Sequence, residues 1–286
     1  MISIFLQGGL GNQLFQIATA ISYGIDNNTN FIFPYSKTLT TGKERNTYWD
    51  TILQNCCKYT TKDLINHIFM FDWSRFAEQQ FLRYSKIPHF QENCLLCGYF
   101  QSYKYFDNNK VKVLEIMGLT EQRVLVKTDF LNLVNNNLNT ISIHFRRGDY
   151  KFISNVHPLM TFEYYKNALS HIPNEILISS HIVYFFEEED ILDVSNIINQ
   201  LKQHFNLNNV FPIDNTIPDW KQLLLMSHFR VNIIANSSFS WWAGYLNNHP
   251  QKQVFYPNVW FGNCITYDLQ DLPLPDWIKI ENEKKN

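Results

Sequence analysis

Two adjacent arginines stand in the segment HFRRGDY, residues 144–150. The segment follows the alternating run ISI at 141–143, which predicts that the arginines come where a strand ends. The carboxyl ends of parallel strands form the edge at which open α/β sheets bind ligands. Because a guanidinium group binds phosphate or carboxylate through two parallel hydrogen bonds, the pair predicts an anion site at such an edge.

The two arginines are expected to differ in role. Neighbouring strand residues point to opposite faces unless the backbone turns, and Gly148 favours a turn directly after them. We expect one arginine to meet a diphosphate while the other pairs with a carboxylate, for which Asp149 is the candidate. Arg146 is favoured for the diphosphate because it shares a strand face with His144. The alternative is a surface Arg–Asp pair that contributes little.

Serines gather in a second segment, NSSFSWW at 236–242, which follows an apolar strand expected at 231–235 and opens a helix. The hydroxyl groups of Ser237, Ser238 and Ser240, with the free amides of a first helical turn, are suited to binding an anion. The alternative is plain capping, with the two tryptophans in the core. Together with the arginines, the serines predict a phosphate pocket formed by two strand ends.

An acidic run, EEED at 187–190, follows a third expected strand at 182–186. Acidic residues before a helix are often a cluster stabilised by the helix dipole. Alternatively, Glu188 and Glu189 accept hydrogen bonds from N1–H and the amino group of a guanine base. The sequence leaves both interpretations open.

A glycine-rich turn, GGLG at 8–11, separates a strand expected at 1–7 from a helix capped by Asn12. The dinucleotide pattern GxGxxG fails at Leu14, no acidic residue ends the next strand at 31–33, and no GK[ST] follows. Two interpretations of the glycine-rich turn remain: a backbone that approaches a ligand closely at a helix N-terminus, or a tight turn without a ligand.

Composition narrows the class of protein. The chain has 286 residues and a formal net charge of −2, which argues against a nucleic-acid partner. No run approaches the roughly 18 apolar residues of a membrane span, and the N-terminus lacks the basic region of a signal peptide. We therefore expect no transmembrane segment and a location in the cytoplasm, with peripheral attachment to a membrane left open.

The five cysteines do not indicate a metal site. The CxxC at 94–97 has no second pair or histidines at ligand spacing, and its two leucines predict a buried strand. We expect structural thiols in a reducing compartment. An acidic DxD motif is also absent where a metal-dependent sugar-nucleotide enzyme would carry one, so the expectation is no metal and no other cofactor.

The elements that position these motifs alternate between strands and helices, which is typical of a parallel α/β sheet. The first series opens the chain, and helices are expected around 61–84. An Asn-rich loop at 133–140 follows, and a second series then runs to a last strand at 254–257. Further elements of the second series are a strand at 140–145, helices at 160–172, 191–205 and 218–228, and a short strand at 210–213. We expect two Rossmann-like α/β domains, 1–137 and 138–286, around a central cleft, with the final residues free to pack back on the first domain.

Four segments carry a resemblance to a known family: GGLGNQLFQ (8–16), GYFQSYKYF (98–106), ISIHFRRGDY (141–150) and NIIANSSFSWWAGYL (232–246). In this order they resemble the inverting fucosyltransferases of glycosyltransferase family 11, the bacterial-type α-1,2-fucosyltransferases. The resemblance covers nearly the whole chain. It implies a GT-B-like fold in which the N-terminal domain serves the acceptor and the C-terminal domain holds GDP-fucose.

The resemblance also implies roles for single residues. In the wider fucosyltransferase group an arginine of the HxRR run contacts the β-phosphate of the donor, which carries over to Arg146 or Arg147 with His144 beside them. An asparagine in the glycine-rich turn lies near the reacting centre, and Asn12 occupies that place. The family usually has a serine and two aspartates where this chain has three glutamates at 187–189, which bears most on the choice of donor.

The expected reaction is transfer of L-fucose from GDP-β-L-fucose to O2 of a terminal galactose in an oligosaccharide acceptor, with inversion. Arg146 or Arg147 would stabilise the departing diphosphate, assisted by Ser237, Ser238 and Ser240, and Asp149 is a candidate for the general base. The alternatives are another fucosyl linkage, α-1,6 or to a protein hydroxyl, and a non-catalytic sugar- or nucleotide-binding protein of the same fold.

Overall fold

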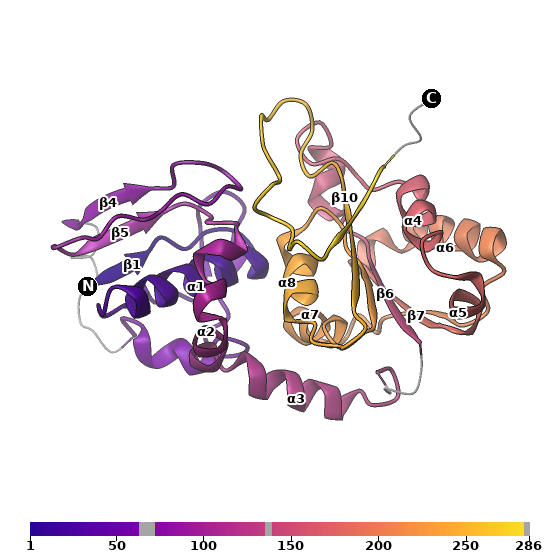
Figure 1. The fold of residues 1–286 in the computed structure, drawn as a ribbon, viewed down its shortest axis with the longest axis horizontal. Coiled ribbons are helices and arrows are strands. Elements are labelled where there is room, and N and C mark those ends of the chain that lie inside the picture. Colours follow the sequence, from indigo (N-terminus) through magenta and orange to yellow (C-terminus); the bar gives the residue numbers. More distant parts are fainter. Residues whose placement is uncertain (63–71, 135–138, 283–286) are drawn as a thin grey trace. The chain divides into compact units, whose positions relative to one another are not determined.

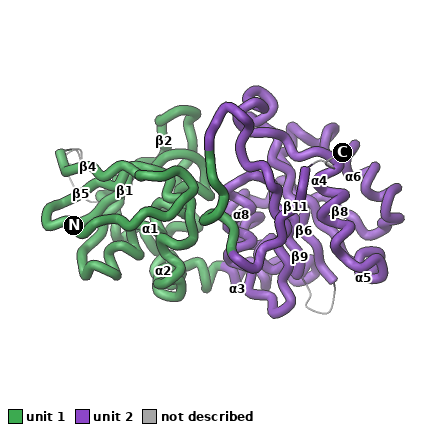
Figure 2. The backbone as a smooth tube through the Cα atoms, turned by 45° about the horizontal axis from the view of Figure 1, so that its top comes forward, with its two compact units in different colours: residues 1–122, 267–274 green, residues 123–266, 275–286 purple. Residues whose placement is uncertain are grey.

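The computed structural model describes residues 1–62, 72–134 and 139–282 (Figure 1). Contacts divide the chain into two compact units, Met1–Gln122 with Tyr267–Leu274, and Arg123–Thr266 with Pro275–Asn286 (Figure 2). The division falls inside helix α3 (Leu119–Asp129). The domain boundary expected at residue 137 stays a prediction.

The first unit is built on a parallel three-stranded sheet with the order β1-β5-β4. Strands β1 (Ile2–Ile4) and β5 (Cys94–Cys97) pair in register from Ile2 opposite Cys94, and β4 (Ser74–Ala77) forms the edge. Helix α1 (Leu10–Asp26) packs against β1. The buried strand predicted from the CxxC leucines is confirmed as β5. The remaining elements of this unit are β2 (Thr38–Leu39), β3 (Arg45–Asn46), the 3-10 turns η1 (Gln54–Tyr59), η3 (Tyr103–Tyr105) and η4 (Asp107–Asn109), α2 (Lys110–Met117) and the start of α3.

Three expectations for this unit need correction. Helix α1 begins at Leu10 with Gly9 as its N-cap, so Asn12 lies inside the first turn and does not cap the helix. Residues 31–33 form two isolated bridges instead of a strand, Ile2 to Phe31 and Phe33 to Thr60. Of the helices expected around 61–84, residues 63–71 lie outside the described residues, and 74–77 form β4, because a neighbouring strand supplies the hydrogen-bond partners.

The second unit contains a parallel six-stranded sheet with the order β11-β10-β9-β6-β7-β8. Its strands are β6 (Thr140–His144), β7 (His181–Phe185), β8 (Val210–Pro212), β9 (Val231–Ile233), β10 (Gln253–Pro257) and β11 (Ile278–Ile280). Its helices are α4 (Phe162–Leu169), α5 (Asn174–Ser179), α6 (Ile191–Phe205), α7 (Asp219–Met226) and α8 (Ser238–Leu246), with the 3-10 turns η5 (Gly148–Phe152) and η6 (Glu188–Asp190). The predicted alternation from 140 to 257 is confirmed, and β11 is an additional edge strand.

Helices cover both faces of this sheet, which explains why its strands are apolar on both sides. Alternate strand residues such as Ile143 and Ile233 pack with α4 and α6 in one continuous core. On the other face, Asn232 donates to the carbonyl of Met226 in α7, and Phe185 packs edge-on against Phe229. Figure 1 shows α4 and α6 on one side of the strands and α7 and α8 on the other.

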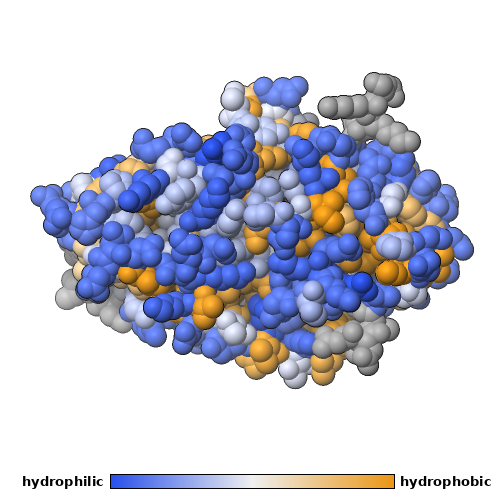
Figure 3. All heavy atoms as spheres, in the orientation of Figure 1, coloured by the Kyte–Doolittle hydropathy of each residue, from blue (hydrophilic) through white to orange (hydrophobic). Residues whose placement is uncertain are grey.

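The surface view in Figure 3 is dominated by hydrophilic residues, with hydrophobic ones in small groups. Among the helices of the described residues, none combines the length and the apolar character needed to cross a membrane.

Candidate active site

The predicted site segments of the second unit follow three neighbouring strands. In the sheet, β6 lies between β9 and β7, and both pairings are parallel, with Ile143 opposite Ile233 and Tyr184. The carboxyl ends of these strands therefore lie at one edge, which brings the segments at 144–150, 187–190 and 236–242 together. The chain runs outward from β6 through β7 to β8, then returns to the other side of β6 for β9. This reversal makes the β6–β9 edge the switch point at which doubly wound sheets bind ligands.

Arg146 lies at this edge with its guanidinium group held from three directions. Nη1 pairs with Glu187, and Nη2 pairs with Asp149 three residues along. The group also lies over the ring of Tyr150, 4.9 Å from its centroid. Its side chain is 17% exposed, whereas those of Asp149 and Glu187 are 26% and 45% exposed. The guanidinium of Arg146 is thus paired with two carboxylates, of which Glu187 is the more exposed.

Arg147 points elsewhere: it lies beyond the end of β6 and is the residue from which the 3-10 turn η5 begins. Its Nε lies 3.4 Å from Asp193 Oδ2 on α6. The expectation that Asp149 pairs with an arginine is confirmed, but the partner is Arg146, the residue favoured for the diphosphate. The turn after β6 carries Asp149 back toward Arg146, and Arg147 pairs with a different carboxylate, Asp193. Which of the two arginines meets a diphosphate stays a prediction.

Stacked aromatic rings pack against the guanidinium group of Arg146. The ring of Tyr150 lies parallel to that of His157, with centroids 4.3 Å apart, and His157 packs in turn on Phe261. The hydroxyl of Tyr150 donates to the carbonyl of Asn236, 3.3 Å away, at the start of the serine segment. This hydrogen bond connects the two strand-end loops. Sequence reasoning missed Tyr150, although an aromatic residue four positions after an arginine at a turn is a usable signal.

His144 ends β6 and is buried, 7% exposed, with its ring 5.4 Å from that of Phe239 on α8. Burial, reinforced by the charge of Arg146, lowers the pKa of His144 to about 3. The imidazole is therefore neutral at physiological pH, since its charged form would have to be desolvated. It can donate or accept a hydrogen bond at the site but contributes no positive charge.

The serine segment forms the start of α8, as predicted. Ser237 is the N-cap, and its Oγ accepts a hydrogen bond from the amide of Phe239 at 3.3 Å. Ser240 is fully buried and its hydroxyl lies 3.5 Å from the carbonyl of Ser237. Ser238 is only partly buried. The structure thus contains the capping arrangement, and Ser238 is the serine whose side chain is most accessible at this edge.

The acidic run after β7 divides into exposed and buried residues. Glu187, Glu188 and Glu189 are exposed, whereas Asp190 is 1% exposed and accepts a hydrogen bond from the Gly148 amide at 2.7 Å. The sequence carried a signal for this difference: Asp190 lies four residues before Val194 and so extends the buried stripe of α6. The predicted contacts of Glu188 and Glu189 with a base remain predictions.

Asn12 belongs to the first unit, at the carboxyl end of β1. Its Oδ1 accepts a hydrogen bond from Gln101 Nε2 at 2.7 Å. Gly8, at φ +78°, turns the chain directly before this point, and a Cβ there would collide with the Asn12 side chain. The glycine-rich turn therefore shapes the environment of Asn12, while its role near a reacting centre stays a prediction.

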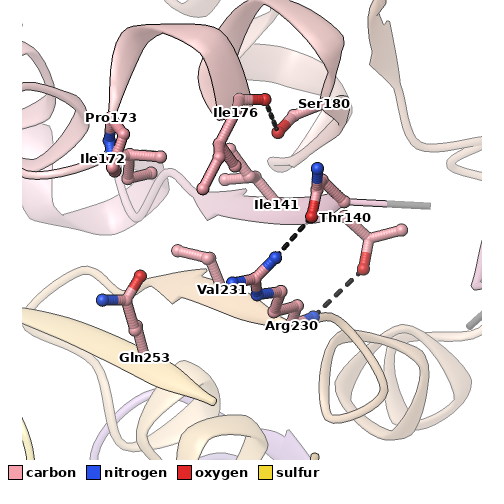
Figure 4. A pocket seen from close by; sticks show the side chains of 10 residues that line it. Thr140, Ile141, Ile172, Pro173, Ile176, Ser180, Arg230, Val231 and Gln253 are labelled. Carbon is pink, nitrogen blue, oxygen red and sulfur yellow. Dashed lines mark hydrogen bonds between the residues drawn. The ribbon is translucent and has the colours of Figure 1, made fainter. Parts of the chain in front are cut away.

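A small pocket lies at the opposite edge of the second sheet. It has a volume of about 160 Å³ and is lined by the first residues of β6, β9 and β10, which are Thr140, Val231 and Gln253 (Figure 4). Arg230 reaches it, with its backbone amide donating to Thr140 Oγ1 at 3.0 Å. Since these are the amino ends of the strands, the pocket is separate from the arginine turn.

Comparisons with known proteins find relatives that align over nearly the whole chain. Two curated proteins from Escherichia coli are each 27% identical to this chain: the O-antigen biosynthesis glycosyltransferase WbnK (96% of this chain, 99% of the relative) and an alpha-1,2-colitosyltransferase (96% and 97%). Two solved structures share the fold, with TM-scores of 0.50 and 0.51. They are a family 9 glycosyl transferase from Veillonella parvula (10% identity, 98% of this chain and 85% of that chain) and E. coli ADP-heptose LPS heptosyltransferase II (9%, 98% and 89%).

These structural relatives are glycosyltransferases of the GT-B type, which confirms the predicted α/β fold class. The sequence profile described as Glycosyl transferase family 11 matches residues 1–281, nearly the full chain. The chain therefore belongs to glycosyltransferase family 11 and is a glycosyltransferase.

Proposed function

We propose that the protein transfers L-fucose from GDP-β-L-fucose to O2 of a terminal galactose, with inversion and without a metal ion. The observation that carries the proposal is the position of Arg146 at the switch point between β6 and β9, beside the start of α8. A guanidinium fork and the amides of a helix N-terminus are donors suited to a diphosphate. Family membership supports the sugar, and the alpha-1,2-colitosyltransferase relative supports the linkage.

In the proposed donor complex the diphosphate takes the place of Glu187 on Arg146. Glu187 is the more exposed of the two carboxylates, so its displacement from Arg146 costs less free energy than displacement of Asp149. Asp149 keeps its hydrogen bond to the guanidinium. The serine segment approaches the same phosphates with the hydroxyl of Ser238 and the free amides of α8. Tyr150 fixes the plane of the guanidinium throughout.

The reaction proceeds with cleavage of the fucose–phosphate bond ahead of bond formation. Negative charge then grows on the departing diphosphate, and the hydrogen bonds from Arg146 strengthen as it does so. Neutral His144 adds a dipole at the same edge without a competing charge. Asp149 remains the candidate for the general base, although an acceptor hydroxyl would have to compete with Arg146 for its carboxylate.

The test is release of GDP from GDP-fucose in the presence of galactose, a galactose-terminated oligosaccharide, an N-acetylglucosamine-terminated oligosaccharide, or no acceptor. We expect acceptor-dependent release with the galactose-terminated oligosaccharide. Release of UDP from UDP-sugars, without release of GDP from GDP-fucose, would reject the donor. Release of GDP only with the N-acetylglucosamine-terminated acceptor would favour another linkage.

Colitose is the second candidate for the transferred sugar. The observation in its favour is the 27% identity to the alpha-1,2-colitosyltransferase over 96% of this chain. The same assay separates the two, since nucleotide-activated colitose would be consumed at a higher kcat/KM than GDP-fucose if colitose is the natural sugar.

A further inference from the structure

Asp190 is a buried carboxylate that contacts the arginine turn at two points. Its Oδ2 accepts the hydrogen bond from the amide of Gly148 at 2.7 Å, and its Oδ1 lies 2.6 Å from Lys151 Nζ. With 1% of its surface exposed, it has no room to touch a ligand itself. Lys151 also approaches Asp193 at 3.1 Å, so the charges around the carboxylate are compensated.

The two contacts fix the backbone directly after the arginines. Gly148 has φ +31°, a conformation that few other residues adopt, and its amide is buried against α6 by the Asp190 carboxylate. Arg146 precedes this point by two residues, and its guanidinium must reach the anion within the narrow geometry of a bidentate contact. A shift of the turn would therefore move Arg146 even though Asp190 does not contact it.

We propose that Asp190 is a positioning residue, which holds the turn after β6 so that Arg146 meets the diphosphate of the donor. This inference rests on the diphosphate site of the proposed function but not on the identity of the base or of the sugar. The contact that matters is the hydrogen bond to the Gly148 amide. The negative charge of Asp190 mainly compensates the positive charge of Lys151.

Three variants separate positioning from a structural ion pair. Asp190→Glu keeps the charge but lengthens the side chain by one methylene, and so pushes the turn outward. Asp190→Asn keeps an oxygen acceptor for Gly148 but removes the charge. Asp190→Ala removes both. Glu163→Ala is the matched control, because Glu163 is an acidic residue of the same unit that pairs with Lys166 on the surface of α4.

Binding of inorganic pyrophosphate, measured by calorimetry on the full chain, is the first readout. We expect Asp190→Glu and Asp190→Ala to raise its Kd at least about tenfold, since small displacements of an anion clamp have large effects, and Asp190→Asn to stay within about threefold. In an Arg146→Ala background the further change Asp190→Glu should have no additional effect. Circular dichroism checks that each variant is folded.

The proposal would be overturned if Asp190→Glu bound pyrophosphate with wild-type affinity. It would also be overturned if Asp190→Asn bound pyrophosphate more weakly than Asp190→Glu, because that result would indicate that only the charge of the side chain matters. Failure of the wild-type chain to bind pyrophosphate overturns it too. If the wild-type chain binds pyrophosphate but not GDP, and Asp190→Glu loses that binding, the donor assignment fails and the role of Asp190 stands.

Discussion

Replacement of Arg146 by alanine should nearly abolish turnover while leaving the fold intact. The guanidinium is the cation that we place against the departing diphosphate. Loss of one such charge-directed donor typically lowers kcat by about a hundredfold or more, roughly 2.7 kcal/mol of transition-state stabilisation. GDP affinity should fall as well, because the same contact exists before the bond breaks.

The stability cost of this substitution should be small. The two carboxylates that lose their partner are Asp149 and Glu187, with side chains 26% and 45% exposed, so water can solvate both. The exposed Arg146–Glu187 pair should contribute about 0–1 kcal/mol, and the partly buried Arg146–Asp149 pair about 1 kcal/mol. We therefore expect a melting temperature within a few degrees of wild type. Arg146→Lys keeps the charge but loses the planar fork, so it should recover turnover only in part.

The assay measures kcat, KM for the donor, GDP affinity and melting temperature for both variants. Arg83→Ala is a matched control, because Arg83 also contacts two carboxylates, Asp268 and Asp271, but belongs to the first unit. If Arg146→Ala keeps both turnover and GDP affinity within about threefold of wild type, no transition-state contact of the expected size exists and the phosphate site is wrong.

Further predictions concern other residues. Asn12→Ala should lower turnover more than GDP affinity, and unchanged kinetics would remove its role near the reacting centre. Arg123 is 8% exposed and donates to Ser227 Oγ at 2.8 Å and to Asn248 Oδ1 at 3.1 Å. Arg123→Ala should therefore cost about 2–3 kcal/mol in urea unfolding, since it removes charge-assisted hydrogen bonds to the hydroxyl and the carbonyl of the buried Ser227, and an unchanged midpoint would contradict this. The pKa of about 3 for His144 means that the unfolded chain binds a proton that the native state does not. Stability should thus fall as the pH drops below about 6.5, by up to about 1.4 kcal/mol per unit. Urea titrations at pH 7 and pH 5 should show a smaller loss for His144→Phe than for wild type. Transfer activity should survive excess EDTA, and inhibition that Mn²⁺ reverses would refute the metal-free mechanism.

Elements with strong periodicity can be predicted from the sequence alone. Strands β6 and β7 are apolar runs with clear boundaries, and α6 carries its buried residues at helical spacing. The start of α8 is equally predictable, because a serine before an apolar run is a cap signal. Since the arginine and serine segments directly follow β6 and β9, their position at strand ends is predictable from the same patterns.

The pairings within the site cannot be predicted in the same way. Which arginine meets Asp149 depends on the backbone turn at Gly148, and that turn depends on Asp190 from a different strand end. Similarly, α1 starts earlier than expected because Gly9 serves as the N-cap without a side-chain hydrogen bond. Strand β11 is a short edge segment that forms by pairing with β10, a contact that no local pattern specifies.

The most direct test of the proposed reaction is the structure of its product. The protein should be incubated with GDP-fucose and a galactose-terminated oligosaccharide, and the purified product examined by two-dimensional NMR. We predict an α-configured fucose whose anomeric proton correlates with C2 of the terminal galactose. A correlation to any other position, a β-configured product, or free fucose as the sole new sugar would contradict the account.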